Sequence, residues 1–589
     1  MMIRDPVCGL PLTETKEEFK AEVRGKIYHF CGEYCKRAFL RGKKIAYFSM
    51  EIGLNNNFHT YSGGLGVLAG DMIKSSADLK IPLVGVTLVS KKGYLKQEIR
   101  NGKQVDLPDD WMPSQFMTEL PVQVELNIQS RKVKLKAWLY DYQSPTGGLV
   151  SILFLDTDLD GNSPEDREIT SFLYGGDQTY RLKQEIILGI GGVKMLEASG
   201  FEIGKYHMNE GHSSLLTIEM LRKNGKDADM VRDVCIFTTH TPVEAGHDQF
   251  SYDLVQEILG EIIPLDTLKE YGGQDRFNMT RLALNLSKYV NGVAKRHKEF
   301  SIALFPGYNI SAITNGVHSF TWTCESFRKL FDKHLPGWAN EPELLVRVDG
   351  IQDVELWLAH VKAKADLARY IRELSGIRFD LNVLTLGFAR RFTGYKRPNL
   401  LFSNLKRLAE INKVGKIQVV FAGKAHPKDW MGKHLIEEIN GFKEQLKDTM
   451  KIVYLENYDL EMAAKLTSGV DVWLNPPLPP YEASGTSGMK AAHNGVINFS
   501  VLDGWGVEGC VEGVTGWAIG PSPKEQLEEA ERRYREVTEL YSKLEYVVIP
   551  KYYRYRDDWI KMMENSIGKV AYYFNSHRMM RRYASEAYL

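Results

Sequence analysis

Strand-like apolar runs and helical segments alternate along the second half of the chain. Such alternation indicates right-handed βαβ units, which build a parallel sheet covered by helices on both faces. The runs are "NVLTLGFA" (382–389), "KIQVVFAG" (416–423), "KIVYLEN" (451–457), "VDVWLN" (470–475) and "VINFSVLDG" (496–504). Leu401, Leu405 and Leu408 mark the first intervening helix. We therefore predict a Rossmann-like domain, whose ligands should lie at the carboxyl ends of its strands.

Basic residues gather where this domain should bind its ligand. The first strand runs into "RRFTGYKR", which contains Arg390, Arg391, Lys396 and Arg397. The fourth strand leads through "PPLPPYEASGTSGMK" to Lys490. A basic run is usually only a solvated face, but cations at the carboxyl ends of parallel strands predict an anion site. Lys490 is unusual, because the helix dipole disfavours a cation in a glycine-rich turn at the start of a helix.

A glycine turn opens a helix early in the first half. Residues 44–50, "KIAYFSM", indicate a buried strand, and "YSGGLGVLAGDMIKSSADL" (61–79) indicates a turn and a helix. Gly63 and Gly64 stand at the helix N-terminus, where bare N–H groups can approach an anion. Such a turn more often serves tight packing, so both interpretations stay open. "GIGGVKML" (189–196) lies inside a helical pattern without a ribose-binding acid at suitable spacing, and we reject it as a dinucleotide site.

Three loops in the first half carry polar side chains directly after apolar runs. They are "YHMNEGHSS" (206–214), "CIFTTHTPVEAGHDQF" (235–250) and "SAITNGVHSF" (311–320). A single histidine at such a place is more often a satisfied core residue, but three loops after three strands predict one cleft. Side chains of these types make directional hydrogen bonds to sugar hydroxyls. We therefore expect a second Rossmann-like domain that faces the first across the cleft.

The expected fold class is α/β: two Rossmann-like domains facing a cleft, as in the B-type glycosyltransferase architecture, plus a small cysteine-rich module at the N-terminus. The expected boundaries place the module at 1–42 and the two Rossmann-like domains at 43–317 and 318–564. A terminal helix at 565–589 should pack back on the first domain. At 589 residues, the chain is long enough for several cores.

Charge and composition limit the classes of partner that we expect for this chain. Lys plus Arg and Asp plus Glu both number 75, so the formal net charge is zero, which gives no electrostatic case for nucleic acid or an anionic membrane. The N-terminus, "MMIRDPVCGLPL", lacks the apolar core of a secretory signal, and no apolar run approaches the ~20 residues needed to span a bilayer. We expect a cytoplasmic protein with a neutral or locally charged ligand and with neither nucleic acid nor membrane as partner.

Three of the six cysteines, Cys8, Cys31 and Cys35, lie near the N-terminus in "DPVCG" and "YHFCGEYC". Six cysteines are too sparse for a disulfide scaffold in a chain of this length. A metal could be bound by two thiolates four positions apart together with the distant third, with His29 or another residue closing the site. Zinc is our expectation, copper or another soft metal is equally compatible, and a thiol-rich fold without metal is the alternative. The spacing resembles that of YHS- and TRASH-type metal-binding modules.

Sequence blocks along residues 44–589 resemble those of the α-glucan phosphorylases, especially the compact prokaryotic type. The blocks, in order, are "YFSMEIGL", "YSGGLGVLAGD", "NEGHSS", "FTTHTPVEAGHD", "AITNGVH", "GFARRFTGYKR", "AGKAHP", "SGVDVWLN" and "EASGTSGMKAAHNGV". The resemblance implies reversible, configuration-retaining phosphorolysis of the non-reducing end of an α-1,4-glucan by inorganic phosphate, which gives α-D-glucose 1-phosphate. The N-terminal cysteine module lies outside the family's usual pattern.

The resemblance also implies a cofactor. The family uses pyridoxal 5′-phosphate, held as a Schiff base by the lysine of the "EASGT..MK" block, which is Lys490 here. Its phosphate group, rather than its ring, acts as proton donor and acceptor. A neutral imine and a nearby phosphate would suit a helix start better than a free cation. The implied chemistry needs no carboxylate pair of the kind that glycosidases use, and we find no convincing pair in the sequence.

The resemblance also implies roles for individual residues, which we carry over by position from the family. The implied catalytic residues are Lys490, Arg391, Lys396 and His240, with His240 binding a sugar hydroxyl rather than acting as a general base. Cofactor-binding residues are Lys490, Arg390, Thr486, Ser487, Tyr458 and Trp322. Substrate-binding residues are Gly63, Gly64, Leu65, Asp177, His240, Asn315, Glu482, Ser484 and Gly485. Arg390 and Thr486 should hold the cofactor phosphate, whereas Arg391, Lys396 and the Gly64 amide should hold the substrate phosphate.

Two other functions stay open. A glycogen or starch synthase shares the two-domain architecture but uses a nucleotide sugar and has no Schiff-base lysine. An inactive carbohydrate-binding protein with a metal-sensing module is the second alternative. The chain has no room for the N-terminal activation segment of the large regulated phosphorylases, so allosteric control by phosphorylation or nucleotides is not expected. The preferred glucan stays open, as does assembly into a homo-oligomer.

Overall fold

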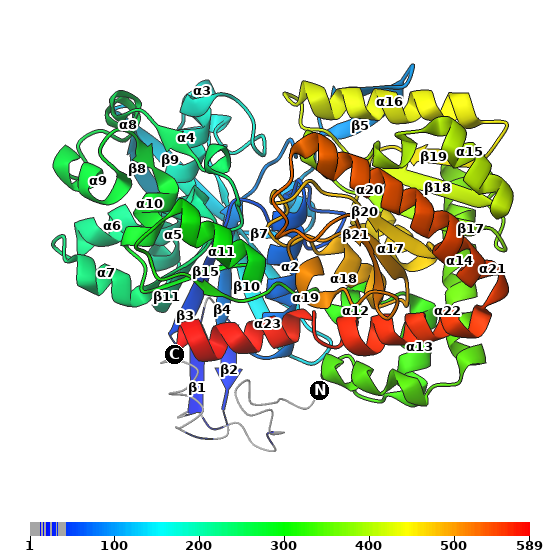
Figure 1. The fold of residues 1–589 in the computed structure, drawn as a ribbon. Coiled ribbons are helices and arrows are strands. Elements are labelled where there is room, and N and C mark those ends of the chain that lie inside the picture. The colour runs from blue at the N-terminus through cyan, green and yellow to red at the C-terminus, as the bar shows by residue number, and fades with distance from the viewer. Residues whose placement is uncertain (1–11, 13–15, 17–18, 24–25, 31, 33–42) are drawn as a thin grey trace.

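The chain forms two α/β halves, each built around its own central sheet (Figure 1). The computed structural model describes residues 12, 16, 19–23, 26–30, 32 and 43–589. In the N-terminal part, β1 (Lys20–Val23) pairs antiparallel with β2 (Lys26–His29). None of the described helices is both long enough and apolar enough to cross a bilayer.

The first half is built on a 10-stranded sheet in the order β16-β15-β12-β11-β3-β4-β10-β9-β7, with β8 paired to β9. Its strands are β3 (Lys44–Ser49), β4 (Leu83–Leu88), β7 (Thr118–Glu119), β8 (Val124–Ile128), β9 (Arg131–Gln143), β10 (Leu149–Asp156), β11 (Ile203–Asn209), β12 (Cys235–Thr238), β15 (Tyr289–Gly292) and β16 (Ser311–Ala312). Neighbours from β16 to β10 run parallel, and β9 runs antiparallel to β10. The strand order reverses between β3 and β11, which makes that place a binding crevice by the rule for open sheets.

The second half has a 6-stranded, fully parallel sheet in the order β19-β18-β17-β20-β21-β22. Its strands are β17 (Leu384–Ala389), β18 (Ile417–Ala422), β19 (Lys451–Leu455), β20 (Val472–Asn475), β21 (Ile497–Val501) and β22 (Gly516–Ile519). The five apolar runs of the sequence form the first five strands, and "GWAI" adds a sixth that we did not predict. The order reverses between β17 and β20, so the basic segment after β17 and the loop after β20 meet at one crevice. The predicted α/β class with Rossmann-like sheets is confirmed.

Helices complete both halves. In the first half they are α2 (Gly64–Asp78), α3 (Pro164–Arg167), α4 (Gln178–Ile186), α5 (Gly192–Ala198), α6 (Leu215–Lys223), α7 (Ala228–Val234), α8 (Tyr252–Leu259), α9 (Leu265–Gly272), α10 (Met279–Asn285) and α11 (Lys295–Leu304), with a short β13–β14 pair (Gln249–Phe250, Phe277–Asn278). The remainder are α12 (Ser319–Trp322), α13 (Glu325–His334), α14 (Asp353–Ser375), α15 (Leu405–Val414), α16 (Trp430–Leu446), α17 (Leu460–Gly469), α18 (Ser487–Ala492), α19 (Gly506–Gly509), α20 (Glu529–Lys543), α21 (Ile549–Arg554), α22 (Arg556–Asn565) and α23 (Ser576–Tyr583).

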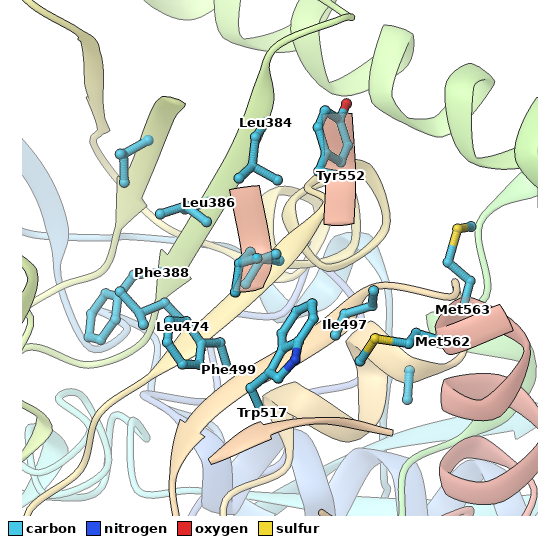
Figure 2. Close-up of a cluster of buried hydrophobic side chains, with 14 of the residues drawn as sticks. Leu384, Leu386, Phe388, Leu474, Ile497, Phe499, Trp517, Tyr552, Met562 and Met563 are labelled. Carbon is cyan, nitrogen blue, oxygen red and sulfur yellow. The ribbon is translucent and has the colours of Figure 1, made fainter. Parts of the chain in front are cut away.

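The core of the second half lies on both faces of its sheet. On one face, Leu384, Leu386 and Phe388 alternate along β17 and share a cluster with Trp517 of β22 and Tyr552 of α21 (Figure 2). On the other face, residues of α14 and α17 pack against β18, β19 and β20. Burying each large apolar side chain contributes roughly 1.5–3 kcal/mol before conformational entropy is counted. A rigid sheet therefore supports the loops at its carboxyl edge.

The β5–β6 hairpin (Lys96–Arg100 and Lys103–Leu107) joins the first half to the second. Gln97 Nε2 donates to the Gly423 carbonyl at 2.9 Å, and Gln104 Nε2 donates to the Ala425 carbonyl at 2.8 Å. Both side chains are buried, so these bonds replace water that the amides would otherwise keep. In Figure 1 the hairpin lies beside α16 of the second half.

The last helix, α23, returns to the first half along the lower edge of the view in Figure 1. Met579, Met580 and Tyr583 lie in one buried cluster with Tyr47 of β3 and Ile73 of α2. These contacts describe α23 alone. They do not test the predicted domain boundaries, which stay predictions.

A buried polar cluster ties α23 to two other segments. Asp78 Oδ2 lies 2.6 Å from His318 Nε2 and 2.8 Å from His577 Nε2. His577 Nδ1 donates to the Asn340 carbonyl at 3.1 Å. In the part of the chain that the structure describes, this is the one group of three His, Cys, Asp or Glu side chains whose atoms could surround a metal ion. Hydrogen bonds already join its members, so we interpret it as a structural cluster.

Candidate active site

A cavity of about 900 Å³ is lined by loops from the carboxyl ends of both sheets. Its lining includes every described residue for which the sequence predicted a cofactor, catalytic or substrate role. These are Gly63, Gly64, Leu65, Asp177, His240, Asn315, Trp322, Arg390, Arg391, Lys396, Tyr458, Glu482, Ser484, Gly485, Thr486, Ser487 and Lys490. Cys8, Cys31 and Cys35 lie outside the described residues, and His29 is not among the lining residues.

Lys490 is a buried lysine on α18 that lines this cavity. Its Nζ lies 3.8 Å from the centre of the Trp322 ring. No described carboxylate lies within ion-pair distance of Nζ, and burial lowers the pKa of Lys490 to about 8. A substantial fraction of the amine is therefore neutral at slightly alkaline pH, which is the state in which it can act as a nucleophile.

Arg390 and Lys396 follow β17 and share one carboxylate partner. Arg390 Nη2 lies 2.7 Å and Lys396 Nζ 2.6 Å from Glu482 Oε2. Burial raises the pKa of Glu482, but the two cations outweigh this effect and hold it at about 2. Glu482 was predicted to bind the sugar; its carboxylate lies against the cations predicted to bind phosphates, because the loop after β20 brings it to the end of β17.

Arg391 differs from these two cations. No described residue forms an ion pair or a hydrogen bond with its guanidinium group, although Arg391 lines the cavity. An arginine fork without a protein partner can bind an oxyanion through two parallel hydrogen bonds. Arg391 and the glycine turn line the same cavity, so both are available to an oxyanion bound there.

Glu51 fixes the glycine turn before α2. Its Oε2 accepts hydrogen bonds from the backbone N–H groups of Ser62 at 2.5 Å and of Gly63 at 3.2 Å. A Cβ atom on Gly63 or Gly64 would meet nothing within 4 Å, whereas one on Gly66 would lie 2.7 Å from Tyr61 Cβ. The space in front of Gly63 and Gly64 thus stays open to the cavity, and α2 begins there without a side-chain cap. Free N–H groups at a helix start bind anions.

His240 is held in one orientation by Asn209 and Glu210. Asn209 Nδ2 donates to Ser49 Oγ at 3.0 Å, which leaves its Oδ1 to accept a hydrogen bond from His240 Nε2 at 2.5 Å. Burial lowers the pKa of His240 to about 3, so the ring is neutral at physiological pH and its Nδ1 can accept a hydrogen bond. Glu210, at a φ of 72°, accepts a bond from the His240 backbone N–H at 2.7 Å. A non-glycine residue at positive φ in such a site is consistent with a functional constraint.

Asn315 supplies an unsatisfied polar atom at the cavity wall. It is buried, and its Oδ1 has no hydrogen-bond partner among the described residues. A buried acceptor without a partner costs about 1–3 kcal/mol, which a ligand hydroxyl would recover. Elsewhere, beside Glu482, burial raises the pKa of Asp503 to about 7, and Asp503 Oδ2 accepts a hydrogen bond from the Glu482 backbone N–H at 2.9 Å.

Several side chains that support the site could not be assigned a role from the sequence. Glu51, Glu210 and Asn209 lie inside the quoted blocks "YFSMEIGL" and "NEGHSS", yet no role was assigned to them. Tyr174, with φ of 55°, also lines the cavity, and its hydroxyl donates to Glu51 Oε1 at 3.0 Å. The available signal was an acid directly after a buried strand, which is where parallel sheets position functional groups.

Comparison with known families identifies the body of the chain. A family profile described as "Carbohydrate phosphorylase" matches residues 49–185 and 265–548. The chain belongs to the carbohydrate phosphorylase family. A maltodextrin phosphorylase of Thermococcus litoralis is 40% identical over 92% of this chain and 70% of its own length. Glycogen phosphorylases of Aquifex aeolicus (37% identical; 93% of this chain, 86% of the relative) and Mycobacterium tuberculosis (36%; 92% and 70%) are similar in extent.

The N-terminal segment matches a second family. Residues 3–44 match the YHS domain, as the cysteine spacing suggested. Within the described residues, His29 ends β2 and its Nδ1 has no hydrogen-bond partner there. Metal binding by this segment stays a prediction, since the three cysteines lie outside the described residues.

Membership of the phosphorylase family implies pyridoxal phosphate, and the cavity fits it. A buried lysine without an ion pair among the described residues, arginines in the same cavity lining and a glycine turn with open space could hold the aldehyde and the phosphate of this cofactor. Thr486 precedes α18 without using its hydroxyl as a cap, so the hydroxyl is available to a phosphate oxygen.

Proposed function

We propose that this chain is an α-1,4-glucan phosphorylase that releases α-D-glucose 1-phosphate from the non-reducing end of a glycogen or maltodextrin chain, reversibly and with retention of configuration. One observation carries the proposal: a buried lysine without an ion pair, a cluster of cations and an unsatisfied hydroxyl-binding group line a single cavity. Family membership and the names of the relatives support it.

Pyridoxal phosphate, when bound, would supply a phosphate group able to pass a proton to and from inorganic phosphate. Lys490 would hold its aldehyde carbon, with Trp322 against the lysine and Tyr458 in the same wall. Arg390 and Thr486, with the backbone at Ser487, would bind its phosphate. Trp473 Nε1 donates to Ser487 Oγ at 3.0 Å, which leaves the Ser487 backbone N–H for the ligand.

Arg391, Lys396 and the Gly64 amide would bind inorganic phosphate. Two phosphates held close together repel each other strongly in a low dielectric, and the cations offset that repulsion. Glu482 already neutralises part of the charge of Arg390 and Lys396. The substrate phosphate would then be positioned to protonate the leaving oxygen and to attack from the same face of the sugar.

His240, Asn315, Asp177, Ser484, Gly485 and the Leu65 amide would orient the terminal glucosyl unit. His240 would accept a hydroxyl hydrogen at Nδ1, because Asn209 occupies Nε2. Burial lowers the pKa of its ring to about 3, so His240 would be a weak base at neutral pH, and a hydrogen bond to the sugar is the role that we propose for it.

Phosphate-dependent release of glucose 1-phosphate from maltodextrin tests the proposal. We expect the full-length chain with cofactor to show this activity, and Lys490→Ala to lose the cofactor absorbance and the activity together. A colourless protein that is active only with a nucleotide sugar would indicate a synthase instead. A chain that binds cofactor and glucan but releases no product would indicate a binding protein.

We further propose that Cys8, Cys31, Cys35 and His29 bind one zinc ion, that the enzyme acts in the cytoplasm, and that nucleic acids and membranes are not its partners. The described cysteines, Cys235, Cys324 and Cys510, are free thiols, which agrees with a reducing compartment. Metal analysis of the wild type and of a Cys31→Ser, Cys35→Ser double variant tests the zinc site. The double variant should lose the metal and keep most phosphorolysis; retention of a full equivalent of metal would contradict the ligand set.

A further inference from the structure

Trp322 separates Lys490 from two charged residues of α2. At the edge of the indole ring, Nε1 donates a hydrogen bond to the Asp71 carboxylate. The distance from Nε1 is 2.8 Å to Oδ2 and 3.1 Å to Oδ1. On the face of the same ring, Lys490 Nζ lies 3.8 Å from the ring centre. Asp71 is 2% and Trp322 2% exposed, so both ends of this arrangement are shielded from water.

Lys74 lies one helical turn after Asp71 and carries the opposite charge. It is 8% exposed, and within the described residues its Nζ donates one hydrogen bond, a long one of 3.3 Å to Thr321 Oγ1. Asp71, Lys74, Thr321 and Trp322 line a second cavity of about 220 Å³. Trp322 lines the large cavity as well, so the indole ring is a wall common to both.

We propose that Asp71 and Lys74 are positioning residues for Lys490: Asp71 fixes the Trp322 ring against the amine through its hydrogen bond at the ring edge, and the two opposite charges next to the ring act on the charge of the amine. This inference rests on the proposed function, in which Lys490 holds the cofactor.

The physical reason for this inference is that Lys490 has no counterion within ion-pair distance in the described part of the chain. Burial is the largest influence on the pKa of Lys490 and lowers it. Because no described carboxylate pairs with Lys490 directly, charges at the next distance modify that effect in a low dielectric. The Asp71 carboxylate favours the ammonium form and raises the pKa of Lys490, whereas Lys74 lowers it. Arg390, Arg391, Lys396, Glu482 and Tyr458 also line the large cavity, and they are unchanged in the variants below.

Protonation matters because only the neutral amine carries the lone pair that attacks an aldehyde. In the loading reaction, the Nζ–carbon double bond forms, and the carbonyl oxygen leaves as water with both amine hydrogens. The rate of loading therefore follows the neutral fraction of Lys490 as pH rises. We compare the midpoint of this rate between variants, and Lys490→Ala, which should give no signal, shows that loading takes place at Lys490.

The test measures how fast pyridoxal phosphate loads onto the full-length, cofactor-freed chain between about pH 6 and about pH 10, by cofactor absorbance. Asp71→Asn keeps an oxygen acceptor for the indole but loses the charge, so the midpoint should fall by about one pH unit. Lys74→Met should move the midpoint in the opposite direction. Asp78→Asn is the matched control on the same helix, because its carboxylate is bound to His318 and His577; its midpoint should stay at the wild-type value.

Opposite shifts in the two variants support the inference, since loss of stability alone cannot move one midpoint down and the other up. Unmoved midpoints, or shifts in the same direction, would overturn it. Circular dichroism shows whether Asp71→Asn folds. If it does not fold, two other measurements decide the question: the loading midpoint of Lys74→Met, and the pH dependence of cofactor release from the Trp322→Phe holoenzyme. In that variant the link to Asp71 is cut, and a midpoint equal to wild type would overturn the role of the indole. A wild-type chain that loads no cofactor would contradict the proposed function itself.

Discussion

Substitution of Arg391 is the most direct test of the proposed phosphate-binding site. We expect Arg391→Ala to raise the KM for phosphate by roughly 30-fold or more, because a charge-assisted, bidentate contact contributes about 2–3 kcal/mol. Cofactor absorbance should not change, since Arg391 has no partner among the described residues that its loss would disturb. Steady-state kinetics at varied phosphate concentration measure the effect.

The control for this variant is Arg397, six positions later. Its guanidinium group pairs with Glu536 and donates to the Pro476 and Pro477 carbonyls, the latter at 2.7 Å. Arg397→Ala should therefore lower thermal stability without a selective change in phosphate affinity. Normal phosphate dependence in Arg391→Ala would mean that the phosphate assignment is wrong.

At the scale of the element, two glycines of α2 differ in their surroundings: Gly64 faces open space, and Gly70 allows close packing. A Cβ on Gly64 meets no atom within 4 Å, whereas one on Gly70 would lie 1.8 Å from the Gly53 carbonyl oxygen. Gly64→Ala should keep or slightly raise the melting temperature yet weaken phosphate binding, because its methyl group enters the anion's space. Gly70→Ala should instead destabilise the protein, by a few kcal/mol, since backbone must move.

Thermal melts and phosphate titrations of both variants check this contrast. A Gly64→Ala enzyme with wild-type phosphate KM would show that the helix start does not bind phosphate. A stable Gly70→Ala protein would show that α2 and the loop at Gly53 can separate at little cost.

At the scale of the whole molecule, the Asp78 cluster links α2, α12 and α23. Burial alone would raise the pKa of Asp78, but hydrogen bonds from His318 and His577 outweigh it and hold the pKa well below its usual range. A carboxyl with a lowered folded-state pKa adds stability above its unfolded pKa and loses it as pH falls. The wild type should therefore lose stability below about pH 4 more steeply than Asp78→Asn.

Denaturant unfolding at several pH values measures this slope. Asp78→Asn should also be less stable than wild type near pH 7, by about 1–3 kcal/mol, because a buried charged hydrogen bond is weakened. Parallel pH profiles for the two proteins would contradict the assignment of acid sensitivity to this cluster.

Much of this molecule could be predicted from its sequence, for physical reasons. Buried parallel strands are uninterrupted apolar runs, so β17 to β21 could be recognised directly, and the resulting sheet brings Arg390 and Lys490 together. β22 was not predicted, because "GWAI" is only four residues long and follows a turn. Family resemblance, rather than periodicity, pointed to His240 and Asn315.

Other contacts could not be predicted, since they join segments far apart in the sequence. The pairing of Asp71 with Trp322 and of Glu482 with Lys396 depends on how the two sheets meet, which no local pattern encodes. Gln97 and Gln104 appear in the sequence as ordinary polar strand residues. Their buried bonds to the second half follow only from the complete fold.

The return of α23 to the first sheet bears on how the protein is made. Tyr47 emerges from the ribosome long before its buried neighbours Met579 and Met580, which lie more than five hundred residues later in the sequence. At about 5–20 residues per second, this face of the first half waits roughly half a minute or longer for its cover. The nascent chain therefore presents an apolar surface throughout synthesis, and a chain cut short before α23 should be a substrate for chaperones rather than a smaller enzyme.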